Sequence, residues 1–449
     1  MHGEVCNYHE LALDYAQARL FDEAVQVLTI PSVAEQLAQA SPLTSYYLGY
    51  FMQGQGLIDE ANAYFVRAEH TAPGCCFPNR LEDVQVLTIA RNTLDHAARA
   101  PYYLGCLYYD KRQYDLAKRY WELSAQRDPS YPTVWRNLAL YYYNKEHDSH
   151  KAQEYMEQAF QLDENDSRVF MELDQLYKRM QRPHTERLKR FETYAHLVVQ
   201  RDDLILEQAT LLNQTGYYDR AAALIDSHIF HPWEGGEGKV PTQYHYARVE
   251  QAKALLHSAM VSGNKTDIQH AIRLLSECLH YPHHLGEGKL QGAQDNDFHY
   301  YLGLAYELLG EDDKARKHWQ LGIVGPTDPA AAMYYNDAKP DKIFYAALCY
   351  RQLGNEERAK GLFHKLINYG KQHIFDVVTM DYFAVSLPDL LVWDADLNQK
   401  NRIHCLYMLA LGYAGMGERE QAMHYLDEAA QLDINHDGIN STYSFLTKL

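Results

Sequence analysis

The sequence predicts an all-α protein, a superhelical solenoid of about eight to ten helical hairpins with inserted loops. Three observations carry this prediction. Small and aromatic residues recur on a grid of about 34 residues. The grid units contain similar turns of glycine and acidic residues. The composition, with 47% hydrophobic and 23% charged residues over 449 residues, is that of a folded protein rather than a disordered one.

The clearest copy of the grid covers residues 101–129. Its predicted first helix carries Leu104 and Gly105, its second carries Ala117 and Trp121, and a proline closes the unit. The two small residues let the helices approach each other, and the aromatic side chain fills the space beside them. This spacing is typical of the tetratricopeptide repeat (TPR), a helix-turn-helix hairpin.

The same grid recurs along the chain. Further copies are Leu48, Gly49, Ala61 and Phe65; Trp135, Ala139, Ala152 and Met156; Gly303, Ala315 and Trp319; Ala347, Ala359 and Phe363; and Ala410 and Ala422. The turns LGEDDKA, LGNEERA and MGEREQA also resemble one another, because a glycine ends one helix and acidic residues suit the start of the next. We expect N-terminal TPR-like repeats over 1–200 and C-terminal repeats with inserted loops over 201–449, continuous with the first.

The charge and the cysteines argue against several classes of partner. A net charge of −18 repels nucleic-acid phosphates and anionic lipids, so we expect no nucleic-acid and no membrane partner. The seven cysteines are scattered without a CxxC pair, which favours reduced thiols. No secretory signal or membrane-spanning run is recognisable, and we therefore expect a cytoplasmic protein.

Two inserted loops carry a shared motif. They read HPWEGGEGKVPTQYHYA (231–247) and YPHHLGEGKLQGAQDNDFHYYLG (281–303), with GEGK cores 50 residues apart. Both are expected at the same edge of the helix stack, one repeat apart, where they can line one pocket. Such a turn can bind a small polar ligand through its amides and charges, or it can be a connector whose charges cap helices. The flanking residues do not fit a Walker phosphate loop.

Candidate ligand-binding residues come from these loops and from irregular segments that include 334–342 and 381–397. Aromatic and acidic side chains can stack on and hydrogen-bond a sugar or a peptide, or they can pack against helix ends. The candidates are Trp233, Glu234, Glu237, Lys239, Glu287, Lys289, Tyr335, Asp337 and Asp381.

No catalytic residue, cofactor or metal ligand is assigned. The chain lacks the Gly-x-Ser-x-Gly and HExxH motifs. The spacing of Cys278, His280, His283 and His284 fits no zinc grid. Carboxylates are abundant, but no spacing selects a pair for glycoside hydrolysis.

Several segments are more specific than the repeat grid: CFPNRLED, RNLALYYYNK, ELDQLYKR, WEGGEGK, LGEGKL, YYND and DYFAVSLPDLL. Together they resemble the C-terminal half of a bacterial family of large uncharacterised proteins, in which an N-terminal β-sandwich domain of unknown function precedes a TPR solenoid. The sandwich is missing from this sequence, which is then either part of a longer protein or a form without that domain. The resemblance implies a sugar-related role and inserted loops that face the sandwich domain.

Two functions are open on this basis. The first is a scaffold whose concave face binds a protein or peptide, or an adjoining β-sandwich domain, without turnover. The second is a carbohydrate-binding or glycoside-processing half-site, with Glu237 and Glu287 as the leading carboxylates and Trp233 as a stacking platform. Both carboxylates in one solvent-filled pocket would favour the second function, and loops buried in helix-capping bonds would favour the first.

Overall fold

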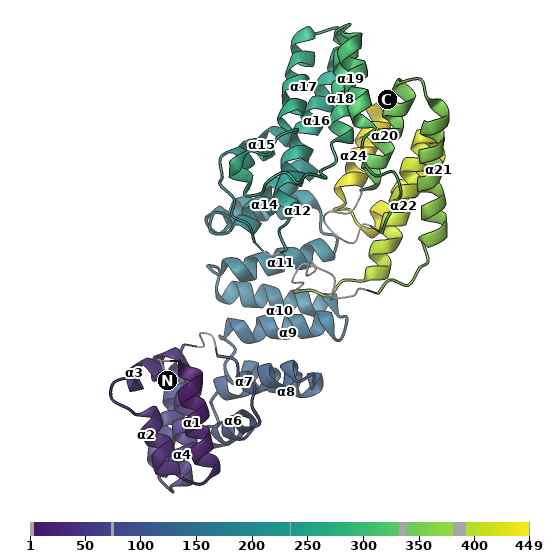
Figure 1. The fold of residues 1–449 in the computed structure, drawn as a ribbon. Helices are drawn as coiled ribbons and strands as arrows, with labels where there is room; N and C mark the ends of the chain where they lie inside the picture. Colours follow the sequence, from purple (N-terminus) through teal and green to yellow (C-terminus); the bar gives the residue numbers. More distant parts are fainter. Residues whose placement is uncertain (1–3, 73–75, 234, 332–338, 380–391, 449) are drawn as a thin grey trace. The chain divides into compact units, whose positions relative to one another are not determined.

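The computed structural model describes residues 4–72, 76–233, 235–331, 339–379 and 392–448. Regular secondary structure in these ranges is entirely helical and runs from α1 to α24, with one short 3₁₀ helix (Figure 1). The prediction of an all-α solenoid is confirmed. None of the helices in the described ranges combines the length and the apolarity that a bilayer crossing requires.

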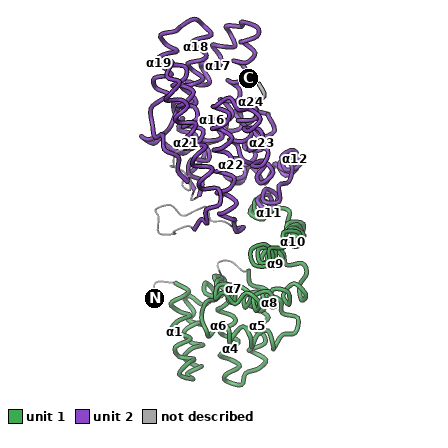
Figure 2. The backbone as a smooth tube through the Cα atoms, turned by 90° about the vertical axis from the view of Figure 1, so that its right-hand side faces the viewer, with its two compact units in different colours: residues 1–173 green, residues 174–449 purple. Residues whose placement is uncertain are grey.

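The chain divides into two compact units, residues 1–173 and 174–449 (Figure 2). The boundary lies inside one helix, α11 (Ser167–Arg179). The expected division between two groups of repeats at residue 200 stays a prediction.

Unit 1 consists of short helices that pair in chain order. They are α1 (Val5–Gln17), α2 (Phe21–Leu28), α3 (Ala34–Ala40), α4 (Pro42–Gly54), α5 (Ile58–His70), α6 (Leu81–Thr93), α7 (Arg99–Asp110), α8 (Tyr114–Arg127), α9 (Pro132–Asn144) and α10 (Ser149–Leu162). The most extensive contacts join neighbours, α4 with α5, α7 with α8 and α9 with α10, as the repeat grid predicts.

The small residues of the grid bring paired helices into contact. A Cβ atom at Gly49 would lie 2.5 Å from Cε1 of Phe65, and one at Gly105 would lie 2.3 Å from Cδ1 of Trp121. Both distances are far below a normal carbon contact, so only glycine leaves room for the aromatic ring of the second helix. The predicted pairing of a small and an aromatic residue is therefore confirmed in unit 1.

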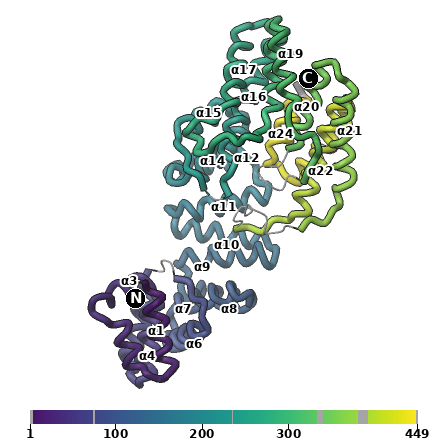
Figure 3. The backbone as a smooth tube through the Cα atoms, in the orientation of Figure 1, coloured from purple at the N-terminus to yellow at the C-terminus, as the bar shows by residue number. Residues whose placement is uncertain are grey.

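Unit 2 continues the pattern, and three of its helices, α16, α21 and α22, are longer than any in unit 1. They are α12 (His184–Thr193), α13 (Ala195–Val198), α14 (Asp202–Gln214), α15 (Tyr218–Asp226), α16 (Lys239–Ser262), α17 (Lys265–Glu277), the 3₁₀ helix (His283–Leu285), α18 (Asn296–Leu308), α19 (Asp312–Gly322), α20 (Pro340–Gln352), α21 (Glu356–His373), α22 (Leu397–Met416), α23 (Arg419–Leu432) and α24 (Asp437–Lys448). In Figure 3 the yellow helix α24 lies beside the teal α16 and the green α20, far from both in sequence.

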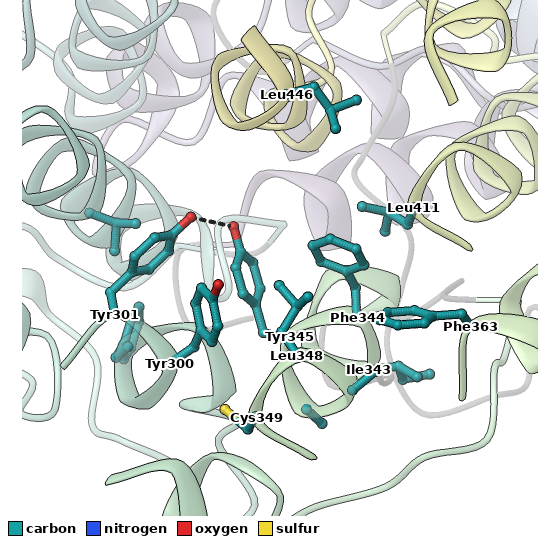
Figure 4. Close-up of a cluster of buried hydrophobic side chains, with 14 of the residues drawn as sticks. Tyr300, Tyr301, Ile343, Phe344, Tyr345, Leu348, Cys349, Phe363, Leu411 and Leu446 are labelled. Carbon is teal, nitrogen blue, oxygen red and sulfur yellow. Dashed lines mark hydrogen bonds between the residues drawn. The ribbon is translucent and has the colours of Figure 1, made fainter. Parts of the chain in front are cut away.

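An apolar core joins the later helices of unit 2. Figure 4 shows its aromatic part, in which Tyr300 and Tyr301 of α18 lie beside Tyr345 of α20, while the neighbouring Phe344 lies against Phe363 of α21. The hydroxyl groups of Tyr301 and Tyr345 are hydrogen-bonded at 3.0 Å. The ring of Phe445 on α24 meets that of Phe344 edge to face, with centroids 5.7 Å apart. The last helix is therefore packed onto the repeat that contains α20.

Unit 2 also closes on itself through polar contacts between residues 178–253 and residues 432–441, which we call the polar seam. Asn435, in the turn before α24, accepts a hydrogen bond from Arg187 at 3.1 Å through Oδ1 and donates one to the carbonyl of Lys178 at 3.3 Å. Asp437 accepts hydrogen bonds from Gln214 at 3.0 Å and from Gln243 at 2.6 Å. The repeat grid did not predict this closure.

Candidate functional site

A cavity of about 750 Å³ lies within unit 2. Its walls come from α16, α18, α20, α22 and α24 and from the loop that contains the second GEGK core. The volume falls in the range of ~300–1,000 Å³ that is usual for ligand pockets. Because the polar seam holds α24 beside α16, the closure of unit 2 forms part of the cavity wall.

The two GEGK loops contact each other at the N-terminal end of α16. The backbone amide of Phe230 donates a hydrogen bond of 2.8 Å to the carbonyl of His284. The amide of Gly238 donates one of 2.8 Å to Oε2 of Glu287, and both of these residues line the cavity. Gly238 has a φ of 72°, a left-handed conformation that glycine adopts without strain, and it caps α16. The structure thus brings together the loops that the sequence paired.

The candidate residues of the first loop are less close to the cavity. Trp233 is partly buried and covers Gly236 of its own loop, where a Cβ atom would lie 2.3 Å from the indole Cε2. Glu237 and Lys239 are exposed. Glu234, together with Tyr335, Asp337 and Asp381 of the later segments, lies outside the described residues.

In the second loop, the two charged candidates have different surroundings. Glu287 is partly buried at the cavity wall, and burial is the main cause that raises the pKa of its carboxyl group, with a further contribution from Glu237. Lys289 instead donates to a carboxylate oxygen of Asp295 at 2.6 Å and to the carbonyl of Leu279 at 2.9 Å. These contacts give Lys289 a local structural role.

The wall formed by α16 contains a buried carboxylate that the sequence did not single out. Glu250 is 1% exposed and lines the cavity. Its Oε1 accepts hydrogen bonds of 2.6 Å from Nζ of Lys253 and from the hydroxyl of Ser441. Its Oε2 is buried and has no hydrogen-bond partner among the residues that the structure describes. Lys253 and Ser441 therefore provide hydrogen-bond partners for one of the two carboxylate oxygens.

His245, on the same helix, is a second polar group at the cavity. Its Nε2 is buried, and the described part of the chain offers it no hydrogen-bond partner. Burial, followed by the positive charge of Lys342 and other nearby cations, lowers the pKa of the imidazole to about 3. His245 is consequently neutral at physiological pH.

Aromatic side chains complete the cavity wall. Tyr246, Tyr345, Tyr407 and Phe445 line it from α16, α20, α22 and α24. The pKa values of the tyrosine hydroxyls at 246, 345 and 407 are raised, above all by burial, so these groups remain neutral. The site combines uncharged rings with a carboxylate whose second oxygen has no partner within the described ranges.

Sequence reasoning missed Glu250, His245 and Tyr407. The only available signal was the run YHYARVEQAK (244–253), in which charged residues interrupt a helical face that carries aromatic and small apolar residues. Such a run is compatible with an exposed helix as well as a buried one. Its burial depends on α24, which contributes Ser441 from nearly two hundred residues later in the chain.

Comparison with known proteins supports the repeat type. Residues 343–369, in α20 and α21, match a tetratricopeptide repeat family. Together with the hairpins described above, this match makes the chain a TPR-like helical-repeat protein.

Similar solved structures include three proteins. The human IFIT1 dimer with PPP-AAAA is 16% identical over 96% of this chain and 91% of that one, with a TM-score of 0.31. Pseudomonas aeruginosa pilF is 19% identical over 50% and 89%, with a TM-score of 0.29. YrrB, a TPR protein with an unusual peptide-binding site, is 16% identical over 38% and 91%, with a TM-score of 0.19. At these values they carry no argument about the ligand of this chain.

Proposed function

We propose that this chain is a TPR-like scaffold that binds a segment of a partner protein in the cavity of unit 2. The observation that supports this proposal most is the wall of that cavity, where successive repeat helices present aromatic rings beside polar atoms that have no partner within the described residues. Helical repeats commonly bind extended or helical peptides along such surfaces.

The packing of α24 supports a protein segment as the occupant. Phe445 packs its ring against those of Phe344 and Tyr345, and Ser441 hydrogen-bonds with Lys253 and Glu250 across the seam. The inner surface of unit 2 therefore already accepts apolar and polar side chains of a polypeptide. The remaining volume, about 750 Å³, has room for several side chains of a partner.

The carbohydrate-binding half-site stays an alternative prediction. Its expected stacking platform, Trp233, covers Gly236 of its own loop, and of its two leading carboxylates only Glu287 lines the cavity. An adjoining β-sandwich domain likewise stays a predicted partner, and the loops at 231–238 and 283–290 are the surface that the resemblance assigns to it.

Selection of peptides on the full chain tests the proposal. Random peptides displayed on phage are selected against the wild-type protein, and the affinities of labelled winners are measured by fluorescence anisotropy. Ala293 is partly buried in the cavity wall, so the variant Ala293→Trp fills the cavity; Val261, which is 85% exposed outside it, provides the matched control Val261→Trp. We expect at least about tenfold weaker binding for the first variant and no change for the second.

Two results would overturn the proposal. Peptides that bind both variants as well as the wild type would place the binding surface elsewhere. Thermal stabilisation by oligosaccharides, in the absence of any selected peptide, would favour the carbohydrate half-site instead.

A further inference from the structure

Within the ranges that the structure describes, two buried polar atoms of α16 in the cavity wall have no hydrogen-bond partner, Oε2 of Glu250 and Nε2 of His245. Folded proteins satisfy nearly all such groups, so each unpaired atom needs an explanation. Both residues belong to one helix and line one cavity. A ligand that brings hydrogen-bonding groups into the cavity accounts for both atoms.

The environment of Glu250 determines which chemistry such a ligand needs. Its Oε1 already accepts hydrogen bonds from Lys253 and Ser441. Lys253 also donates to the carbonyl and the hydroxyl oxygen of Ser441, at 3.2 Å and 3.0 Å, so its ammonium group is held within the polar seam. The free oxygen is a carboxylate acceptor, which binds cationic donors more strongly than neutral ones.

The aromatic rings that line the cavity with Glu250 also favour a cationic group. Tyr246 and Tyr345 line the same cavity as Glu250, and after burial the charge of Glu250 is among the causes that raise the pKa values of both hydroxyl groups. Neutral aromatic rings beside a carboxylate attract a cation through their faces as well as through the carboxylate charge.

The charged side chains that line the cavity also favour a cationic ligand. Among the described residues, six carboxylate side chains and two lysines line it. One of the lysines, Lys342, is paired with Asp297. The whole chain has a net charge of −18. An anionic ligand is therefore disfavoured, and a basic one is attracted.

Building on the proposed function, we propose that the partner segment places the ammonium or guanidinium group of a lysine or arginine side chain against Oε2 of Glu250, with the cavity's aromatic rings around it. The neutral imidazole of His245 then meets another polar group of the same segment. The site selects a basic peptide.

A double-mutant cycle tests this assignment. A selected peptide with a lysine is compared with the same peptide carrying norleucine, against the wild type and against Glu250→Gln, which keeps the side-chain shape and removes the charge. We expect the wild type to prefer lysine at least about tenfold and Glu250→Gln to lose most of that preference. The norleucine peptide, which lacks the cation, is expected to lose less affinity for Glu250→Gln than the lysine peptide, and circular dichroism shows separately that the variant is folded. The surface variant Glu307→Gln is the charge control and is expected to keep the lysine preference.

The outcomes separate the two proposals. If selected peptides bind in the cavity, as shown by Ala293→Trp, but contain no excess of lysine or arginine and show no coupling to Glu250, the basic-group assignment is wrong while the scaffold function stands. If no peptide binds in the cavity, the proposed function fails. If Glu250→Gln weakens the lysine and norleucine peptides equally, Glu250 has only a structural role and the assignment is again overturned.

Discussion

The amide of Gly238 donates a hydrogen bond of 2.8 Å to Oε2 of Glu287, and this contact joins two loops that share the GEGK motif. The carboxylate supplies a partner for an amide at the start of α16, where helix amides otherwise lack one. Since α16 forms a wall of the cavity, the contact links the loops to the geometry of the site.

Removing that carboxylate is expected to weaken the start of α16. We predict that Glu287→Ala lowers the free energy of unfolding by about 1 kcal/mol, whereas Glu287→Gln, which retains an acceptor oxygen, loses less. Urea unfolding followed by circular dichroism measures both. Equal stability of the alanine variant and the wild type would show that the hydrogen bond contributes nothing.

The close approach of helices in a hairpin depends on glycine. A Cβ atom at Gly303 would lie 2.1 Å from Nε1 of Trp319, so we predict that Gly303→Ala displaces the indole and destabilises the protein by about 1–3 kcal/mol. Gly361, also within a helix, has open space around it, and Gly361→Ala is expected to be neutral or stabilising by up to about 1 kcal/mol. Thermal unfolding of the two variants makes the comparison. The packing argument fails if both behave alike.

Partly buried histidines that stay neutral predict a loss of stability in acid. Burial is the first cause that lowers the pKa of His245 to about 3 and that of His299 to about 4, and it also lowers the pKa of His436. In the unfolded chain these imidazoles bind protons near their ordinary pKa of about 6.5, whereas in the folded chain they stay neutral. Their contribution to stability is therefore complete above about pH 6.5 and decreases as the pH falls towards 4.

The test compares urea unfolding midpoints at neutral pH and near pH 5 for the wild type and His245→Gln. Each such histidine contributes a slope of up to about 1.4 kcal/mol per pH unit in this window, so the variant is expected to lose less stability on acidification than the wild type. Identical pH dependence of the two proteins would contradict the assignment of a neutral, partly buried His245.

The polar seam is expected to depend on Asn435. Its side-chain oxygen accepts hydrogen bonds from Arg187 and His184 at 3.1 Å and 3.2 Å. The variant Asn435→Ala removes this acceptor from both donors. We predict a destabilisation of about 1–3 kcal/mol. Amide hydrogen exchange is expected to become faster in α24. The exposed Gln431, in the preceding helix, gives the control Gln431→Ala; equal exchange in both variants would mean that the seam does not depend on Asn435.

The repeat architecture was predictable from sequence because it rests on local contacts. Gly105 and Trp121 lie only sixteen positions apart, and their approach is determined within one hairpin. The meeting of the GEGK loops was also predictable, since equivalent loops of consecutive repeats lie at one edge of the stack.

The polar seam and the unpaired carboxylate were not predictable in this way. Asn435 meets Arg187 across nearly two hundred and fifty residues, and neither residue belongs to the repeat grid. From sequence alone Glu250 is expected to face solvent, whereas in the structure it accepts a hydrogen bond from Ser441. Sequence periodicity predicts which helices form. The cavity also depends on the contact between α24 and α16, which lie far apart in the sequence.

Hydrogen–deuterium exchange of the full chain, with and without a selected peptide, tests most directly where this protein binds its partner. We predict that the peptide slows exchange in α16 over residues 239–253 and in α24 over residues 437–446, two neighbouring helices that line the cavity. Protection confined to residues 1–173, with unchanged exchange in both helices, would contradict the account.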